Sequence, residues 1–202
     1  MSLRRATDAD RPAITAFLRD RIATSMFPLG NLETHGMEGD HPHVTRFWLQ
    51  EGAGGLTGLV GLTNAGMVLP QMPEGGLSGV TAALRGHAVE GFAGEAGQVA
   101  ALSEALGAMD WTAALSKDET LFTLELSALT VPEGDPTLVP LDGADPDTLR
   151  GWIADYGIEA LAGDPATAPI EAAERYDRHA AAGTTAVLMD ASSPRRRSAR
   201  CP

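Results

Sequence analysis

The stretch best suited to chemistry runs from Ala88 to Gly107 and reads AVEGFAGEAGQVAALSEALG. An apolar segment leads there into three spaced glycines, and a helical pattern follows. Glycines let the backbone approach a ligand closely, and the N–H groups at a helix N-terminus carry partial positive charge, so such a turn can cradle a pyrophosphate. The residues expected to bind a cofactor are Gly91, Gly94, Gly97 and Gln98.

Two features of this turn favour a structural role instead. The spacing G-x-x-G-x-x-G differs from the dinucleotide-binding pattern G-x-G-x-x-G, and no Gly-Lys-Ser/Thr follows as it would in a P-loop. Glu95 stands in the middle of the turn, where its charge would repel a phosphate. The alternative interpretation is a strand-to-helix turn that only needs flexible residues.

A general base is the second requirement for chemistry at this turn. Glu90 is the acidic residue nearest to a suitable position, on the predicted strand just before the glycines. A glutamate there could take a proton from an attacking amine. The competing interpretation is a surface acid on an edge strand.

Three histidines beside an acid form another candidate cluster. His35, His41 and His43 lie with Asp40 in a predicted loop, but their spacing matches no recognised ligand pattern. No metal site is therefore predicted. The sequence also lacks a G-x-S-x-G elbow, which argues against a hydrolase triad.

The composition narrows the class of protein. Residues 1–190 hold all 27 acidic residues but only 11 of the 15 Lys and Arg, a net charge of −16, so nucleic acid is not an expected partner. No apolar run of about 18 residues predicts a membrane span. The N-terminal MSLRRATDADRP lacks the apolar core of a signal peptide, and Cys201 is the single cysteine, so a reducing cytoplasm is the expected location.

The hydrophobic periodicity predicts an α/β fold with a mixed sheet flanked by helices. The expected order is strand, two helices, three strands, helix, strand, helix, strand, with residues 30–44 as a polar loop and Thr63-Asn64-Ala65 as a hairpin turn. The predicted ranges are a helical region at 9–29, strands at 46–51, 55–62 and 66–73, a helix at 77–85, a strand at 88–92, helices at 97–107 and 110–116, and a strand at 121–129.

The opening of this pattern recurs further along the chain. Leu3–Arg21 aligns without a gap on Leu138–Tyr156, at an offset of 135 residues and with four identical positions. Each copy reads as a strand, an acidic turn that can cap a helix, and a helix with apolar residues three and four apart. A tandem duplication explains this shared pattern better than chance. After its first strand and helix, the second copy continues with a helix at 170–181 and a strand at 184–190.

Together, the N-terminal LRRATDADRPAITAFL, the β-hairpin and the strand, glycine turn and helix at 88–107 resemble the GNAT superfamily of acyl-CoA N-acyltransferases. The stretch LFTLELSALTVPEGDPTLVPLDGADPDTLRGWIADYGIEAL, at 121–161, is similar more specifically to tandem-domain bacterial GNAT proteins. In those proteins a degenerate first domain precedes a catalytic second one. The resemblance covers residues 1–190.

The resemblance implies a domain that binds acetyl-CoA where two central strands splay apart. It also implies, without a metal, attack on the thioester by an amine of a small molecule or peptide, with Glu90 as the candidate base. Family members bind the pyrophosphate through R/Q-x-x-G-x-G/A at a helix N-terminus. The equivalent segment here is Gly91–Gly97. Its glycines match this motif in part, and the leading Arg or Gln of the motif is missing.

The predicted organisation is a degenerate GNAT-like domain at 1–130, a linker at 131–136, the N-terminal part of a second GNAT-like domain at 137–190, and a disordered basic tail at 191–202. In this family the strand before the tail would turn back into another strand, so we expect the second domain to be truncated, by a frame shift or an early end. The expected function is an acyl-CoA-dependent N-acyltransferase impaired by that loss. The alternative is a non-catalytic scaffold or dimerisation module, and the uncovered sheet edge allows a homo-oligomer.

Overall fold

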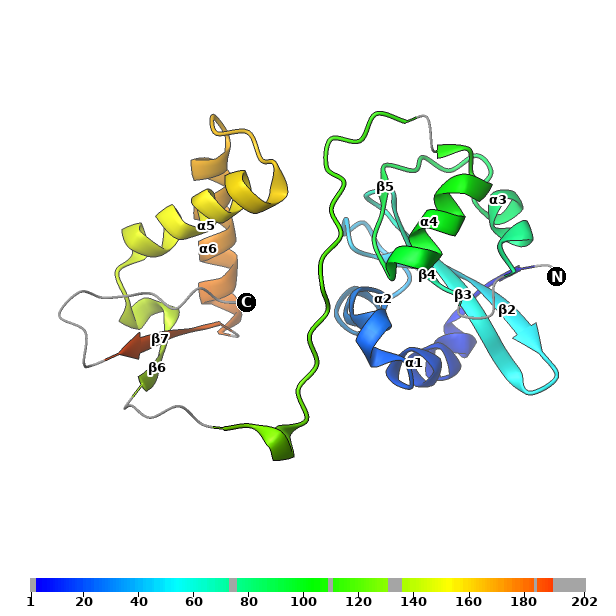
Figure 1. Cartoon of the computed structure of the whole chain (residues 1–202), viewed down its shortest axis with the longest axis horizontal. Coiled ribbons are helices and arrows are strands. Elements are labelled where there is room, and N and C mark those ends of the chain that lie inside the picture. Colours follow the sequence, from blue (N-terminus) through cyan, green and yellow to red (C-terminus); the bar gives the residue numbers. More distant parts are fainter. Residues whose placement is uncertain (1–2, 73–75, 109–110, 131–135, 184, 191–202) are drawn as a thin grey trace. The chain divides into compact units, whose positions relative to one another are not determined.

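The computed structural model describes residues 3–72, 76–108, 111–130, 136–183 and 185–190. Contacts divide the chain into unit 1, which comprises Met1–Thr112 and Asp118–Thr123, and unit 2, which comprises Ala113–Lys117 and Leu124–Pro202. Each unit has its own sheet and its own helices (Figure 1).

Unit 1 contains a five-stranded sheet in the order β1-β2-β3-β4-β5. Its strands are β1 (Arg4–Arg5), β2 (Thr45–Gly52), β3 (Gly55–Thr63), β4 (Met67–Gln71) and β5 (Gly91–Phe92). Its helices are α1 (Arg11–Arg19), α2 (Ile22–His35), α3 (Val80–Ala83) and α4 (Ala96–Ala105), with short 3-10 helices η1 (Asp8–Asp10) and η2 (Leu77–Gly79). All neighbouring strands are antiparallel except β4 and β5, which are parallel, so the predicted mixed α/β sheet is confirmed.

Both faces of this sheet are buried, because successive side chains on a strand point to opposite sides. On β2, Phe47 and Leu49 belong to a cluster with α1 and α2, whereas Trp48 belongs to a second cluster with α3 and α4. Helix α1 contributes Ile14, Phe17 and Leu18 to the first cluster, at the three- and four-residue spacing that the sequence predicted. The result is a three-layer unit with one pair of helices on each face of the sheet.

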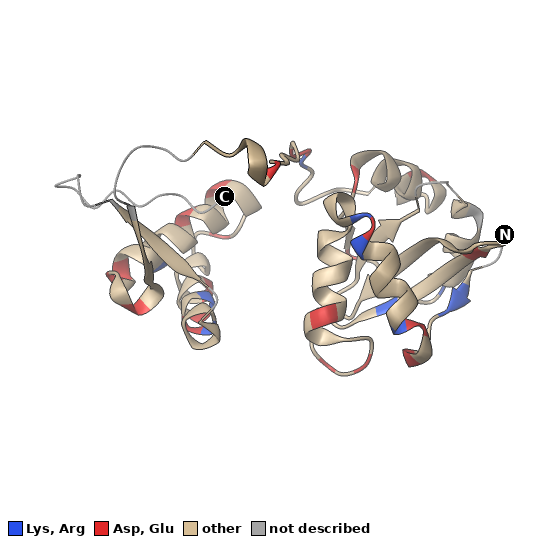
Figure 2. Cartoon of the chain, turned by 90° about the horizontal axis from the view of Figure 1, so that it is seen from below, with Lys and Arg blue, Asp and Glu red and all other residues tan. Residues whose placement is uncertain are grey.

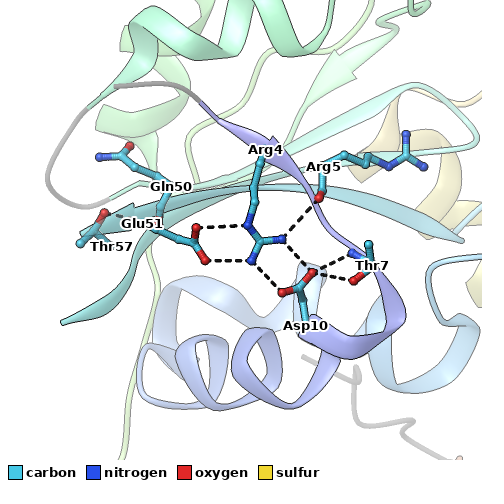
Figure 3. A network of polar contacts seen from close by, with 7 residues as sticks. All are labelled: Arg4, Arg5, Thr7, Asp10, Gln50, Glu51 and Thr57. Atoms are coloured by element: carbon cyan, nitrogen blue, oxygen red, sulfur yellow. Dashed lines mark hydrogen bonds and ion pairs between the residues drawn. The ribbon is translucent and has the colours of Figure 1, made fainter. Parts of the chain in front are cut away.

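A polar network ties the start of the chain to the sheet (Figure 3). The Arg4 guanidinium donates to both carboxylate oxygens of Glu51 on β2, at 2.8 and 3.1 Å, and to both of Asp10, at 2.7 and 2.9 Å. Asp10 also accepts from the backbone N–H and hydroxyl of Thr7. The hydrogen bonds from Arg4 hold the pKa of Asp10 well below its usual range and lower the pKa of Glu51. The network therefore closes the turn between β1 and α1 and fastens it to β2.

Unit 2 contains a two-stranded antiparallel sheet and two long helices (Figure 1). Its elements are β6 (Pro136–Pro140), η5 (Leu141–Gly143), α5 (Pro146–Leu161), α6 (Ala168–Ala182) and β7 (Ala186–Asp190), preceded by η4 (Leu126–Ala128). Leu141, Leu149 and Tyr176 form its buried cluster, with Val187 of β7 packed against it. The sheet of unit 2 is thus covered on the face that meets α5 and α6.

Both units contain the same succession of elements. In each, a strand is followed by a 3-10 helix, two α-helices and a strand that pairs antiparallel with the first. Asp10 and Asp145, identical in the two aligned stretches, each occupy the N-cap of the helix that follows. The two aligned stretches of sequence therefore lie on corresponding elements.

The predicted loop at 30–44 is wrong in its first part, because α2 continues to His35. Leu32 is fully buried in the cluster with α1, so packing extends the helix past the polar residues around it. Gly36, with a φ of 73°, then ends the helix. The hairpin around Thr63-Asn64-Ala65 is confirmed by the antiparallel pairing of β3 and β4.

Three other predicted ranges differ from the structure. Only Gly91 and Phe92 of the predicted strand 88–92 pair with a neighbouring strand. No helix forms at 111–116 and no strand at 121–129, where the one regular element is the 3-10 helix η4. The side chains at 111–130 are exposed, so little apolar surface is buried there to stabilise the helix or strand that the pattern favoured. The predicted tail at 191–202 and all of the linker except Pro136 lie outside the described residues.

Acidic side chains outnumber basic ones in both units (Figure 2). A surface of this sign disfavours electrostatic attraction to phosphate backbones, which depends on clustered Lys and Arg. Among the described residues, no helix combines the length and the apolar character that crossing a bilayer requires.

Candidate functional site at the glycine turn

The predicted cofactor-binding residues lie where β5 turns into α4. Strand β5 runs parallel to β4, with Gly91 opposite Met67 and Phe92 opposite Val68. The pairing ends with a hydrogen bond from the Ala93 N–H to the Val68 carbonyl, 3.0 Å long, although β4 itself continues to Gln71. The two parallel strands therefore share only the first part of β4 before the chain turns into α4.

Close contact with β4 explains two of the glycines. A Cβ atom on Gly91 would lie 3.1 Å from Met67 Sδ, and one on Gly94 would lie 3.3 Å from Pro70 Cγ and Cδ. None of Gly91, Gly94 and Gly97 has a positive φ. Gly91 and Gly94 therefore allow this segment to pack tightly on β4, rather than to adopt a backbone conformation that other residues avoid.

The N-terminus of α4 already holds an anion, which comes from the chain itself. Glu95 is the N-cap residue, and its carboxylate accepts hydrogen bonds from the Gly97 and Gln98 N–H groups, each 2.9 Å long. The hydrogen bond from Gly97, and to a smaller extent that from Gln98, lowers the pKa of Glu95. The acid that would repel a phosphate is thus bound at the position where a phosphate would be expected.

Replacing Glu95 with Ala is expected to destabilise unit 1 by about 1 kcal/mol, because the first turn of α4 loses its cap. The folded-state pKa of Glu95 is lowered, so its contribution is present above the unfolded pKa and is lost as the pH falls through the folded pKa. Urea unfolding of the wild type and the variant from pH 7 down to pH 3 should show a difference in free energy of unfolding that shrinks with acid. Glu104→Ala, an exposed glutamate on the same helix, is the matched control. An equal loss in the control, or a difference independent of pH, would contradict the capping role.

Gln98 connects α4 to the end of β4. Its side-chain Oε1 accepts a hydrogen bond of 2.5 Å from the Met72 N–H. Alternate residues of a strand direct their backbone groups to the same neighbour, so Val68, Pro70 and Met72 all face the β5 side. The Val68 carbonyl is bonded by Ala93, Pro70 has no N–H, and the Met72 N–H is bonded by Gln98. Beyond the paired part of β4, this edge therefore offers no free donor at Pro70 or Met72.

Glu90 lies at the other end of β5, beside the hairpin turn. Its N–H donates to the Gly66 carbonyl at 2.9 Å, and its exposed side chain lies against the α-carbon of Gly66, where a Cβ atom would come within 2.7 Å of Glu90 Cγ. The structure thus separates the candidate base, at the start of β5, from the helix N-terminus that follows the strand.

Sequence reasoning missed the polar groups of β4. Gln71 is buried, and its side-chain Oε1 has no hydrogen-bond partner among the described residues. The Met72 N–H is likewise part of the site because Gln98 reaches it. The predicted strand 66–73 contained both residues, but no local pattern indicated that a helix distant in sequence would contact its end.

The structure brings the rings of the three histidines close together. The rings of His35 and His41 stack with centroids 3.9 Å apart, and His43 lies 5.4 and 5.6 Å from them. His41 Nδ1 accepts the His43 backbone N–H at 3.2 Å, which occupies one ring nitrogen. Burial, followed by the charges of the other two histidines, lowers the pKa of His35. Within the described ranges, no group of three His, Cys, Asp or Glu side chains is arranged to hold a metal ion.

The glycine turn therefore combines a short parallel strand pair, a helix N-terminus that binds a carboxylate, and a glutamine that bridges to β4. Such a turn can bind one anionic group at a time, and Glu95 now supplies it. No family model, curated protein or solved structure matches the chain.

Proposed function

We propose that the chain is an acyl-CoA-dependent N-acyltransferase of GNAT type, which transfers an acetyl group from acetyl-CoA to an amine of a small molecule or peptide. The observation that carries the proposal is that the glycine turn binds an anion at a helix N-terminus, beside the parallel strands β4 and β5. A pyrophosphate uses the same backbone N–H groups that now hold the Glu95 carboxylate.

In this proposal Glu95 competes with the cofactor and holds the site in a state of low affinity. Acetyl-CoA binds only when the carboxylate leaves the Gly97 and Gln98 N–H groups. In the transfer step, the amine nitrogen forms a bond to the thioester carbonyl carbon, the carbon–sulfur bond breaks, and CoA leaves as a thiol. Glu90 is the residue to which we assign removal of the proton from the amine.

Removal of the competing carboxylate is expected to increase the affinity for acetyl-CoA. Isothermal titration should give weak binding for the wild type and a Kd at least about tenfold lower for Glu95→Ala, a gain of about 1.4 kcal/mol. Glu104→Ala, which removes an equal charge from the same helix, should bind like the wild type. Release of free CoA thiol in the presence of a panel of amines then tests turnover by the variant.

A second function, a non-catalytic scaffold module, is favoured by the closed edge of β4. Pro70 offers no donor there, and Gln98 occupies the Met72 N–H, so an acyl group finds no free backbone N–H on that edge. If neither the wild type nor Glu95→Ala binds acetyl-CoA while both remain folded, the acyltransferase proposal fails and the scaffold function replaces it.

A further inference from the structure

Two arginines at the β1 edge of the unit 1 sheet form no ion pair with a carboxylate among the described residues. Arg5 of β1 is the register partner of Trp48 on β2, and Arg46 lies two residues before that tryptophan, so all three side chains belong to one face of the sheet. Arg4 binds its two carboxylates on the other face, and Figure 3 shows the Arg5 side chain pointing away from them. Unpaired arginines are unexpected in a chain with 27 acidic residues and 15 Lys and Arg.

The buried ring of Trp48 holds this cluster in place. Arg5 Cζ lies 5.1 Å from the ring centroid, within the range of a cation–π contact. The imidazole of His87 meets the same ring at a steep angle, with centroids 5.5 Å apart. Arg46 is half-buried, and its Nε is buried with no hydrogen-bond partner in the part of the chain that the structure describes. Because a buried N–H without an acceptor is costly, this guanidinium is suited to an acceptor from outside the chain.

The electrostatic environment of the cluster is positive, although the chain as a whole is acidic. Burial, followed by the charges of Arg46 and Arg5, lowers the pKa of His87. Both arginines therefore lie close enough to act on the imidazole. Two guanidinium groups and a ring nitrogen together offer several N–H donors with excess positive charge, which is the combination that binds an oxyanion.

We propose that Arg5, Arg46 and His87 form a binding site for one phosphate group carried by a small molecule. The two guanidinium groups match the charge of a phosphate monoester, which is close to −2 at neutral pH, and each can donate two parallel hydrogen bonds to its oxygens. Asp8 and Glu38 line a small cavity together with the two arginines. These carboxylates would repel a second phosphate, so the site suits a single phosphate group and not a nucleic acid backbone.

This site is separate from the glycine turn. Strands β1 and β2 begin the strand order of the sheet, whereas β5 ends it. The proposed phosphate site uses side-chain donors, whereas the glycine turn uses the backbone N–H groups that hold Glu95. The inference therefore does not rest on acetyl-CoA binding, and the two sites can be tested independently.

Titration of the full chain with inorganic phosphate at pH 7 and constant ionic strength, followed by NMR, tests the proposal. We expect saturable shifts of the Trp48 indole N–H and of the His87 ring signals. Arg5→Gln and Arg46→Gln should each raise the Kd at least about tenfold, because each removes a charge-assisted contact. Arg19→Gln is the matched control, since it removes the same charge from α1, which covers the other face of the sheet. This control should bind like the wild type.

Three results would overturn the proposal. Shifts that do not saturate, or that saturate equally in Arg46→Gln, would mean that the arginines do not hold the anion. Acetate that binds as tightly as phosphate would mean that the site does not select a phosphate group. Saturable shifts confined to the Gly97 and Gln98 amides would assign the anion to the glycine turn. Circular dichroism checks the fold of each variant, and Arg5→Gln, which changes an exposed side chain, carries the test if Arg46→Gln does not fold.

Discussion

Replacement of Phe47 by Ala is expected to lower the free energy of unfolding of unit 1 by about 3–5 kcal/mol. Phe47 lies in the middle of β2, is 1% exposed, and belongs to the cluster with α1 and α2. Its ring covers the opposite residue, Gly61, whose added Cβ would lie 3.1 Å from Phe47 Cε1. Gly61 has no side chain that could fill the cavity left by the ring. The expected loss is a large part of the free energy of unfolding of a typical domain, which is about 5–15 kcal/mol.

The matched control for this core variant is Phe122→Ala, which removes the same ring from a side chain that is 86% exposed. Its effect on stability should stay within about 0.5 kcal/mol. Urea unfolding followed by circular dichroism measures both variants. A loss below about 1 kcal/mol for Phe47→Ala would mean that its ring is not part of the core between the sheet and helices α1 and α2.

The second large loss of stability is expected from a substitution in the hairpin turn between β3 and β4. Gly66 has a φ of 82°, and a Cβ atom there would lie 2.7 Å from Glu90 Cγ and 3.1 Å from the Glu90 backbone nitrogen. Gly66→Ala therefore combines an unfavourable backbone conformation with a clash against the residue that begins β5. We expect a loss of about 1–3 kcal/mol in the free energy of unfolding and a weaker hydrogen bond between Glu90 and Gly66.

Gly30→Ala makes the same chemical change but is expected to raise the free energy of unfolding instead of lowering it. Gly30 lies inside α2, has no positive φ, and has no atom within 4 Å of an added Cβ. Alanine there should stabilise the chain by about 0.5–1 kcal/mol, because glycine is a poor helix former. Thermal unfolding of both variants would show opposite shifts in Tm, and amide exchange at Glu90 should be faster only in Gly66→Ala. Shifts of the same sign would contradict the geometry of the turn.

At the glycine turn, some features could be predicted from the local sequence and others depended on tertiary contacts. The three glycines and the start of α4 near Gln98 were recognisable from residue types alone. The sequence did not indicate that glycine is needed at 91 and 94 because of contact with Met67 and Pro70. Those contacts join segments more than twenty residues apart. Glu95 was recognised as unfavourable for phosphate, but its role as the cap of its own helix depends on a side-chain conformation that no spacing predicts.

The sequence by itself determined the elements whose pattern is strong and local. The apolar spacing of α1, the hairpin around Asn64 and the shared opening of the two units follow from periodicity and turn chemistry. Only the tertiary structure decided where α2 ends, how short β5 is, and that 121–129 stays unpaired, since Leu32 has a buried place and Leu126 does not. The physical reason is that a helix or strand of weak local preference persists only where another part of the chain covers its apolar face.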